Sequence, residues 1–465
     1  MSNLIINFFK EPPLKEEIKD NSVVDKMFKY WSFRIFYTTY IAYILVHLCR
    51  KNIAVALPFM GSELHLTNTQ LGILGSTLYI TYGVGKFFNG ILADKTNIRA
   101  FLPTAFILTG IANLCFLYST IYITPDRITF FGLPSCTVLL WVLAFFWGAN
   151  GWFQSMVFPP ISKALSYWIA KSERATKWSI WTTSHKCGVF VSVLFSGFLV
   201  QHFGWRSVFY VPAIISIIFS LWLFERLRDK PQTMGLPDID KYKNEKVDIE
   251  SDEDNLNNMS YLAIFKKYVL CNKIIWLIAL SFSFVYLVRF SVEDWFIKYL
   301  VEYKNNTIEL ATSKLSLFAV FGSIGAIASG FMSDKLFNQD RIKINIIFFI
   351  GLILSLIFFH VNKINTLDYF YVALIGFFEA GPQFLLGGVC ALEASTKKVA
   401  SAALGFCGMF GYLGAILSST GTGVMVDNFG WKGAVIFWAL SAIIGLFTCA
   451  LIILYKRKEK LTNKG

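Results

Sequence analysis

The stretch GILADK, residues 90–95, returns in closely similar form as GFMSDK, residues 330–335. Two further stretches repeat in the same way: HFGWR (202–206) resembles NFGWK (428–432), and YILVHLCR (43–50) resembles FSFVYLVR (282–289). Each pair falls at an equivalent place in its half of the chain. The sequence therefore predicts two structural repeats that run in the same direction.

The composition indicates an integral membrane protein. Of the 465 residues, 55% are hydrophobic and only 16% are charged, and the mean hydropathy is +0.54. This balance lies outside the range that is usual for soluble globular proteins. The N-terminal region contains KEPPLKEEIKD (10–20) and lacks the apolar core of a signal peptide, so we expect a cytoplasmic N-terminus. The eight cysteines show no paired spacing such as CxxC, and neither a disulfide framework nor a metal site is predicted.

Apolar runs long enough to cross a hydrocarbon core of roughly 30 Å as helices come in two groups of six. They lie near residues 32–57, 70–92, 101–123, 135–162, 178–200 and 207–225, and near 273–300, 313–332, 343–362, 368–392, 400–425 and 433–454. Each run is too long for a barrel strand and lacks period-two alternation. We predict an all-α membrane protein with twelve transmembrane helices in two parallel six-helix repeats, an arrangement that places a substrate site near the midplane between the halves.

The predicted organisation has five parts. They are an N-terminal segment (1–31), a first six-helix bundle (32–225), a linker (226–270), a second bundle (271–455) and a C-terminal tail (456–465). The linker contains DKYKNEKVDIESDEDNLNN (240–258) and is predicted to be solvated. Glycine and proline inside the spans, as in GVGKFFNG (83–90) and VFPP (157–160), permit close packing or bending.

The net charge of +13 is explained by membrane topology. Most of the 43 Lys and Arg fall in segments that are cytoplasmic if both termini are inside, as the positive-inside rule requires. No nucleic-acid partner is needed to account for the basic excess. Five basic residues are assigned to the membrane interior, away from the ends of the spans: Arg50, Lys51, Lys86, Lys186 and Arg289.

Arg50 and Arg289 are the main candidates for the functional site. An arginine inside a span costs at least about 2.5 to 3.5 kcal/mol, so each guanidinium needs compensation. One interpretation is a structural ion pair, for which Glu293 and Asp294 follow Arg289 closely. The other follows from the repeat, because a pseudo-twofold axis brings the two arginines towards each other across a central cavity. Two guanidinium groups repel unless an oxyanion lies between them, and their planar forks bind phosphate bidentately. We therefore predict a phosphate site.

Further candidates lie near these arginines in the sequence. Tyr43 and His47 precede Arg50, and Tyr286 precedes Arg289, at helical spacing, although the tyrosines could equally be packing residues. Lys51 is predicted to pair with Asp294. Lys86 is predicted to be a second cavity charge, with pairing to an interior acid as the alternative.

Other polar residues in the spans have two possible uses. His185, next to Lys186, could donate to a phosphate and titrate near neutrality, or could be a hydrogen-bonded packing residue. The pairs Asn150 with Gln154, and Glu379 with Gln383, are spaced to bind substrate or to join helices by hydrogen bonds.

The sequence contains no GxSxG, Walker-type GxxxxGK[ST], HExxH or Gly-rich dinucleotide motif. We therefore expect a protein that is not an enzyme, that needs no cofactor or metal, and that draws on a gradient rather than on ATP.

The chain resembles the major facilitator superfamily through the repeated GILADK and GFMSDK motifs, and more specifically the organophosphate:phosphate antiporters. The stretches that carry the closer resemblance are LCRKNIAVALPFM, YGVGKFFNGILADKTNIRAFLP, NGWFQSMVFPP, SERATKWSIWTTSHKCG, LRDKPQTMGLP, VYLVRFSVEDW, GPQFLLG and GFCGMFGYLG. The resemblance implies that Arg50 and Arg289 bind phosphate, that His185 lies in the substrate site, and that Lys51 and Lys86 support it. Tyr412, in the last stretch, is counted with the substrate-binding residues. Asp94 and Asp334, in the repeated motif, are expected to form gating salt bridges together with Glu293 and Asp294.

The resemblance implies a secondary antiporter of the bacterial inner membrane that imports an organophosphate in exchange for inorganic phosphate. Within the family, DIDKYKNE, FKKYVLCNKIIW, CALEASTKK and GFCGMFGYLG are most similar to glycerol 3-phosphate antiporters, which makes glycerol 3-phosphate the expected substrate. GSTLYITYG, GANGWFQ and SERATKWSIWTTSH are more similar to the hexose phosphate sensor branch, so hexose 6-phosphate antiport or sensing is the alternative. We expect a monomer whose ligands are a small phosphorylated metabolite and phosphate.

Overall fold

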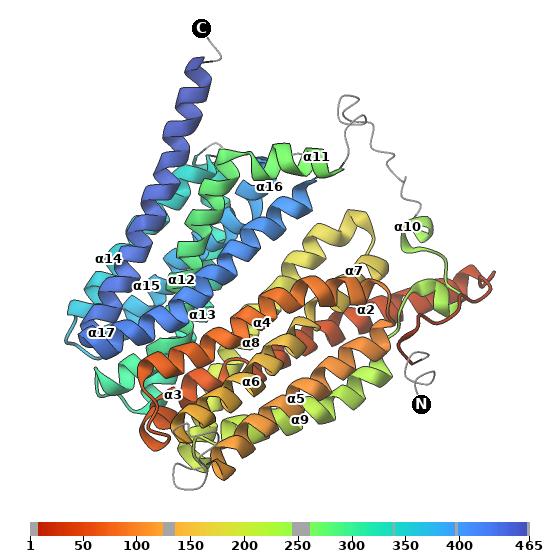
Figure 1. Cartoon of the computed structure of the whole chain (residues 1–465). Coiled ribbons are helices and arrows are strands. Elements are labelled where there is room, and N and C mark those ends of the chain that lie inside the picture. The colour runs from red at the N-terminus through yellow and green to blue at the C-terminus, as the bar shows by residue number, and fades with distance from the viewer. Residues whose placement is uncertain (1–7, 124–134, 244–260, 338–339, 396–398, 463–465) are drawn as a thin grey trace. The chain divides into compact units, whose positions relative to one another are not determined.

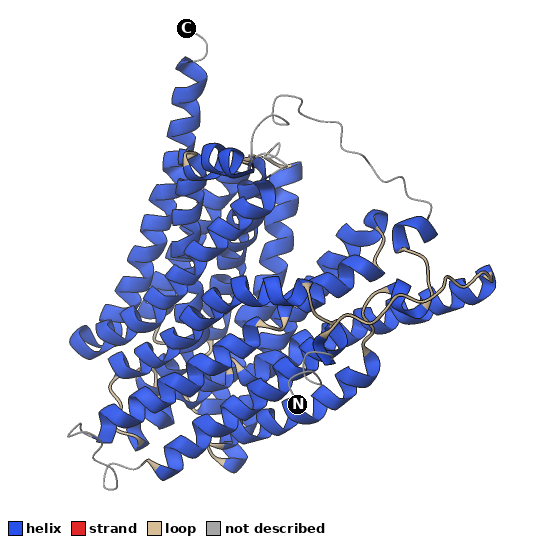
Figure 2. Cartoon of the chain, turned by 45° about the vertical axis from the view of Figure 1, so that its right-hand side comes forward, coloured by secondary structure: helices blue, strands red, loops and turns tan. Residues whose placement is uncertain are grey.

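The computed structural model describes residues 8–123, 135–243, 261–337, 340–395 and 399–462 (Figure 1). Throughout these residues the regular structure is helical, as the colouring in Figure 2 shows. The contacts divide the chain into two compact units. Unit 1 comprises Met1–Ala56 and Thr77–Glu250, and unit 2 comprises Leu57–Ser76 and Ser251–Gly465. This grouping differs from the predicted bundles at residues 57–76, which belong by their contacts to unit 2.

Helices of the first half follow the predicted spans with two breaks. The elements are α2 (Asn21–Val46), η1 (His47–Cys49), α3 (Asn52–Glu63), α4 (Asn68–Asp94), α5 (Ile98–Tyr122), α6 (Ser135–Ser155), α7 (Phe158–Trp168), α8 (Lys171–Phe203) and α9 (Ser207–Arg226). The first predicted span is interrupted between α2 and α3. The fourth is interrupted at Met156 and Val157, and the two prolines of VFPP follow in the first turn of α7, so this proline pair marks a bend as predicted.

Within unit 1 the long helices pack side by side. α5 lies beside α9 and α6, and α2 lies beside α8 (Figure 1). Gly85 on α4 allows a close approach, because a Cβ at this position would lie 2.4 Å from the hydroxyl oxygen of Ser155. Gly85, the second glycine of GVGKFFNG, therefore permits the close helix packing that the sequence predicted.

The segment after α9 differs from the prediction of a solvated linker. It forms the turn η2 (Pro231–Met234) and the short helix α10 (Ile239–Tyr242). Leu227, Leu236 and Ile239 are buried in the same hydrophobic core as Phe28 of α2. The Tyr242 ring stacks on that of Phe28, with 4.3 Å between centroids. Scattered apolar residues in a charged segment were enough to dock it, whereas residues 244–260 lie outside the described part of the chain.

Unit 2 contains the second set of spans. Its elements are α11 (Tyr261–Phe265), η3 (Lys266–Leu270), α12 (Lys273–Glu302), α13 (Ile308–Lys335), α14 (Arg341–Val361), α15 (Leu367–Phe384), η4 (Leu385–Cys390), α16 (Ala391–Glu393) and α17 (Ala400–Thr462). α12 packs along α17, and α13 and α14 each pack on α15. Gly430 has φ 64° and ψ −172°, which divides α17 into the two helices that the sequence predicts as the last two spans.

Nine stretches among the described residues are long and apolar enough to cross a membrane. One of them, Ala402–Tyr455, contains two predicted spans, because α17 continues through the kink at Gly430. The predicted spans on α4 and on α6 with α7 are not among the nine. Together these stretches account for ten of the twelve predicted spans, and helices of the expected length occupy the remaining two.

Candidate functional site

The helix of the first span is broken at the arginine that the sequence singles out. α2 ends at Val46, a single 3-10 turn follows, and Arg50 has a φ of −115°. The prediction that Tyr43, His47 and Arg50 share one regular helical face is therefore wrong. A break of this kind leaves backbone carbonyl groups without helical donors, and these carbonyls need partners from elsewhere.

Two amide side chains of α6 meet this need. The Cys49 carbonyl accepts hydrogen bonds from Asn150 Nδ2 at 2.9 Å and from Gln154 Nε2 at 2.8 Å. Gln154 Oε1 in turn accepts from Arg50 Nε at 2.6 Å, and the guanidinium carbon lies 4.4 Å from the centroid of the Tyr82 ring. Gln154, predicted as a substrate-binding residue, thus anchors Arg50, and the pair with Asn150 joins helices by hydrogen bonds.

A histidine pair lies directly beside this break. His47 Nδ1 is 2.7 Å from the Tyr43 carbonyl oxygen, and the His47 ring centroid is 4.8 Å from that of His185 on α8. Tyr43 is buried and its ring lies 6.2 Å from His185. Gly188 makes room for His47, because a Cβ there would lie 2.7 Å from His47 Nδ1. The structure thus brings Tyr43 and His185 together and adds Gly188, a residue that sequence reasoning missed.

The remaining basic candidates of unit 1 differ in their surroundings. Lys86 is exposed, and its ammonium lies 5.4 Å from the centroid of Phe158, whose ring is 6.1 Å from that of Tyr43. Lys86 and Tyr43 therefore lie beside the same aromatic ring, that of Phe158. Lys51 is buried, and its predicted pairing with Asp294, itself largely buried, stays a prediction.

In unit 2, Arg289 lies in a buried polar cluster. Arg289 Nε donates to Glu293 Oε1 at 2.8 Å, and both side chains are almost fully buried. The Gln383 amide satisfies both of its neighbours when its oxygen accepts from Arg289 Nη1 at 2.5 Å and its nitrogen donates to Glu379 Oε1 at 3.1 Å. The ion-pair interpretation is thereby confirmed for Glu293. The sequence paired Glu379 with Gln383, and the structure adds that Gln383 connects Glu379 to Arg289.

Two tyrosines lie beside this cluster. The guanidinium carbon of Arg289 is 5.4 Å from the ring centroid of Tyr286, and the rings of Tyr286 and Tyr412 are 6.3 Å apart. Tyr412 comes this close because α17 touches α12 through glycine: a Cβ at Gly414 would lie 2.0 Å from the Ser283 carbonyl oxygen. The predicted substrate residues of the second half are therefore neighbours in one unit.

The repeated GILADK and GFMSDK motifs behave differently in the two units. Asp334 accepts from Arg341, which also contacts Glu393 at 3.2 Å. Asp94 is exposed, and none of the ion pairs among the described residues includes it. Instead, the buried Lys163 donates to the carbonyl groups at the end of α4 and pairs with Glu11 at 2.7 Å. A salt bridge is therefore found for Asp334 within its unit and, among the described residues, is not found for Asp94. The gating role of these residues stays a prediction.

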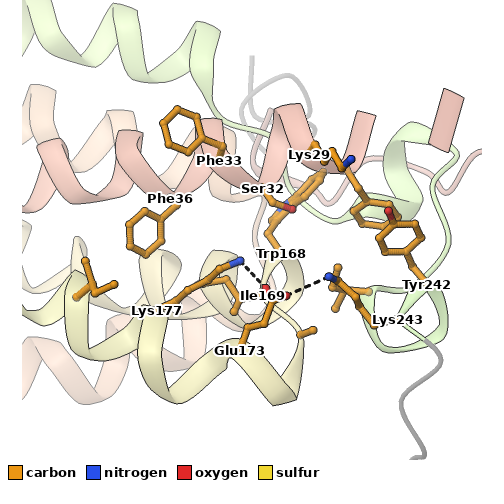
Figure 3. Close-up of a pocket in the computed structure, with 14 residues that line it drawn as sticks. Lys29, Ser32, Phe33, Phe36, Trp168, Ile169, Glu173, Lys177, Tyr242 and Lys243 are labelled. Atoms are coloured by element: carbon orange, nitrogen blue, oxygen red, sulfur yellow. Dashed lines mark hydrogen bonds and ion pairs between the residues drawn. The ribbon is translucent and has the colours of Figure 1, made fainter. Parts of the chain in front are cut away.

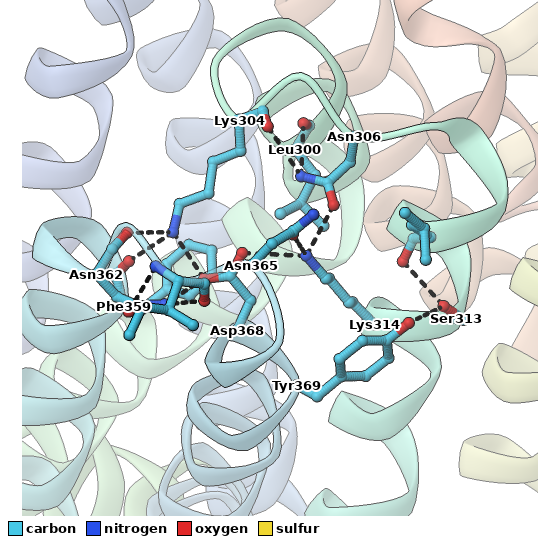
Figure 4. A network of polar contacts seen from close by, with 12 residues as sticks. Leu300, Lys304, Asn306, Ser313, Lys314, Phe359, Asn362, Asn365, Asp368 and Tyr369 are labelled. Carbon is cyan, nitrogen blue, oxygen red and sulfur yellow. Dashed lines mark hydrogen bonds and ion pairs between the residues drawn. The ribbon is translucent and has the colours of Figure 1, made fainter.

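A second buried polar network lies at the other end of unit 2 (Figure 4). The Asp368 carboxylate accepts from Lys304 at 2.7 Å and from Lys314 at 3.1 Å, one oxygen for each. Lys314 also donates to Asn306 at 2.7 Å and to Asn365. Sequence reasoning missed this network. The local signal is Lys314 at the start of the eighth predicted span, but two of its partners, Asn365 and Asp368, are 51 and 54 positions away.

Among the described residues, no group of three or more His, Cys, Asp or Glu is placed to hold a metal ion. Both arginine clusters instead offer hydrogen-bond donors on guanidinium, phenol and imidazole groups. Such donors are suited to bind an oxyanion.

Comparison with known proteins agrees with this chemistry. Residues 39–402 match the family model of the Major Facilitator Superfamily. The chain is 38% identical to a probable hexose phosphate transport protein of Chlamydia muridarum, over 97% of this chain and 96% of that protein. It is 33% identical to the membrane sensor protein UhpC of Salmonella typhimurium (97% of each chain), and 33% identical to the glycerol-3-phosphate transporter of Bacillus subtilis (96% of this chain, 98% of that protein).

A solved structure shows the same fold. The crystal structure of a bacterial homologue of the human lysosomal transporter Spinster, inward-facing and unoccupied, superimposes with a TM-score of 0.71 at 13% identity, over 91% of this chain and 95% of that chain. The protein therefore belongs to the Major Facilitator Superfamily and has its twelve-helix fold. Its relatives place it in the branch of organophosphate:phosphate antiporters, and it is a multi-pass membrane transporter.

Proposed function

We propose that the protein is a secondary antiporter that exchanges a phosphorylated metabolite for inorganic phosphate, with Arg50 and Arg289 binding the phosphoryl group. The observation that carries the proposal is the matched setting of the two arginines. They occupy equivalent repeat positions, each is anchored through Nε by a side chain of its own unit, and each lies against a tyrosine ring. A guanidinium held in this way has its fork oriented before a ligand arrives.

The acidic residues around Arg289 are part of the proposed cycle. A phosphate that binds Arg289 competes with Glu293 for the same guanidinium, so binding exchanges one interaction for another. Binding of this kind couples occupancy to rearrangement of the site, because a ligand shifts a conformational equilibrium only by its differential affinity for the two states. His185 and Tyr412 would supply further donors to the phosphorylated substrate.

The substrate is proposed as hexose 6-phosphate, with glycerol 3-phosphate as the second candidate. The relative at 38% identity is a probable hexose phosphate transport protein, and the glycerol-3-phosphate transporter is 33% identical. The similarity of several stretches to glycerol 3-phosphate antiporters keeps the second candidate open. A sensing role is the third, since the relative from Salmonella typhimurium is a membrane sensor protein.

Transport into proteoliposomes tests the proposal. Purified protein is reconstituted with or without internal phosphate, and uptake of labelled glucose 6-phosphate and glycerol 3-phosphate is measured separately. Uptake of one ligand that requires internal phosphate supports antiport and identifies the substrate. Binding without flux would instead favour the sensor, and uptake independent of internal phosphate would contradict exchange.

We further propose that the protein acts as a monomer in the bacterial inner membrane with both termini in the cytoplasm. The basic excess in the segments on the side of the termini supports this orientation. Labelling of single cysteines introduced near each end of the chain, with a reagent that does not cross the membrane, tests it in intact cells. Labelling without permeabilisation would contradict the orientation.

A further inference from the structure

Unit 1 contains a cavity of about 490 Å³ that is separate from the arginine cluster (Figure 3). It lies between the N-terminal part of α2, the junction of α7 and α8, and the docked linker helix α10. Phe28, Phe33 and Phe36 line it from α2, Trp168 from α7, and Tyr242 from the linker. None of the residues predicted for substrate binding is among those that line it.

The charges in this cavity are predominantly positive. Lys29, Lys177 and Lys243 line it, and Glu173 is the acidic residue that faces them, which gives a net charge of +2 from three lysines and one glutamate. Lys177 and Lys243 approach the Glu173 carboxylate from opposite sides, at 2.6 and 3.0 Å (Figure 3). Each ammonium has three donors, so these two contacts leave further donors for an anion.

The cavity lies where both helices change from polar to apolar. On α8, Glu173 and Lys177 precede the apolar stretch that begins at Ile180. On α2, Lys29 is followed one turn later by Phe33, which is 68% exposed, and Ile180 is 52% exposed. In a protein that spans a membrane, such a change marks the boundary between headgroups and acyl chains. The cavity therefore has a basic part at the headgroup level and an exposed apolar wall beside it.

We propose that this cavity binds the headgroup of an anionic phospholipid, with its phosphate on Lys177 and Lys243 and its acyl chains along Phe33, Phe36 and Ile180. A free phosphate would use the lysines but would leave the apolar wall uncovered, whereas a phospholipid matches both parts. Basic pockets between transmembrane helices on the cytoplasmic side are suited to anionic headgroups, and the surface of this leaflet is negative. A bound lipid would join α2 and α8 to the linker segment. This inference depends on the membrane location and on the cytoplasmic orientation of the termini proposed above, and is independent of which substrate the protein carries.

Native mass spectrometry of the full-length protein tests the site. Retention of phosphatidylglycerol is compared with retention of phosphatidylcholine in the wild type and in the K177Q/K243Q variant. Because each lysine near a membrane surface contributes about fivefold to anionic lipid binding, we expect the double variant to lose preference for phosphatidylglycerol by roughly 25-fold. Lys241→Gln is the matched control: Lys241 lies on α10, two positions before Lys243, pairs with Glu17 and does not line the cavity, so the preference should be unchanged.

A second variant separates lipid binding from structural damage. Glu173→Gln breaks both ion pairs but keeps the lysines, so it should retain or strengthen the binding of phosphatidylglycerol while K177Q/K243Q loses it. If both variants lost binding equally, the lysines would act only through the fold and the proposal would be overturned. Equal retention of the two lipids by the wild type would also overturn it. Displacement of phosphatidylglycerol by millimolar inorganic phosphate would reassign the cavity to a free anion.

Discussion

Arg289 and Glu293 form a buried ion pair, with 2.8 Å between Nε and Oε1, on the same helix that carries Tyr286. One turn of α12 thus holds Arg289, which is proposed to bind phosphate, and Glu293, whose carboxylate would compete with phosphate for the guanidinium group. Gln383 links the same guanidinium to the fully buried Glu379 on α15. The charge of Arg289 is therefore balanced by a carboxylate of its own unit before any substrate binds.

Glu293→Gln should strengthen phosphate binding. The substitution keeps the size of the side chain and a hydrogen-bond acceptor but removes the charge that competes for Arg289, so we expect roughly tenfold tighter binding, equivalent to about 1.4 kcal/mol. Equilibrium binding of labelled phosphate to purified protein measures this change. Unchanged or weaker binding, with a normal unfolding temperature, would show that Glu293 does not compete with the substrate.

Arg289→Lys should impair transport although it conserves the charge. Lysine cannot bond Glu293 through Nε, bond Gln383 through Nη1 and present a planar fork at the same time. Loss of one charge-assisted hydrogen bond, about 1.5 to 3 kcal/mol, lowers kcat/KM for exchange by roughly 10- to 100-fold. Phosphate exchange in proteoliposomes, corrected for the amount of inserted protein, checks this. Arg206→Lys serves as the comparison, because Arg206 lies over the Trp205 ring, outside both arginine clusters and the Asp334–Arg341 salt bridge. Normal exchange by Arg289→Lys would contradict the proposed site.

Gln154→Ala should raise KM for phosphate more than Asn150→Ala does. Both substitutions remove a donor to the Cys49 carbonyl, so each should lower the free energy of unfolding by about 1 to 3 kcal/mol. Only Gln154 also holds Arg50. The comparison of exchange kinetics and unfolding temperature in the two variants separates positioning from stability, and equal KM values would remove the positioning role.

Asp368→Asn should destabilise the protein more than the loss of a single hydrogen bond between uncharged side chains in the same network. It would leave the ammonium groups of Lys304 and Lys314 without their shared carboxylate (Figure 4), and breaking a buried pair in this way costs about 3 to 5 kcal/mol. Tyr369→Phe, which removes one hydrogen bond to Ser313, should cost only about 0.5 to 1.5 kcal/mol. Unfolding in detergent measures both variants, and similar midpoints would mean that the network contributes little.

Acidification should release the N-terminal segment around Glu11 from its contacts with Lys163 and Lys230. Burial alone raises the pKa of Glu11, but hydrogen bonds from Lys163 and Lys230 outweigh it and hold the pKa of Glu11 below its ordinary value of 4.5. Because the folded-state pKa is lowered, the stabilisation is complete above about pH 4.5 and is lost as the pH falls through the lowered value. Limited proteolysis of the segment as a function of pH measures this release. Glu11→Gln should be cleaved readily at all pH values, and a wild type whose cleavage does not change with pH would contradict the prediction.

The sequence predicted most of the candidate site but not how its parts are held. Arg50, Arg289, Tyr286 and His185 were recognisable because charged and polar residues inside apolar spans are costly and few. Glu293 was recognisable as a partner because it follows Arg289 by one helical turn. The anchoring of Arg50 by Gln154 could not be predicted, since it depends on a break in the first span that no local signal such as an internal proline marks at that point.

By itself the sequence determined that the protein is a membrane protein with repeated six-span halves, and which residues carry charge inside them. These properties depend on apolar length, charge and internal similarity, all of which are local or periodic along the chain. Only the tertiary structure decided that Gln154 holds Arg50, that Gln383 joins Arg289 to Glu379, and that Asp368 pairs with two lysines. It also decided that the first part of the charged linker packs against α2. These contacts join side chains up to about 200 positions apart, and they form only when helix packing brings their backbones together and burial makes an unpaired polar group costly.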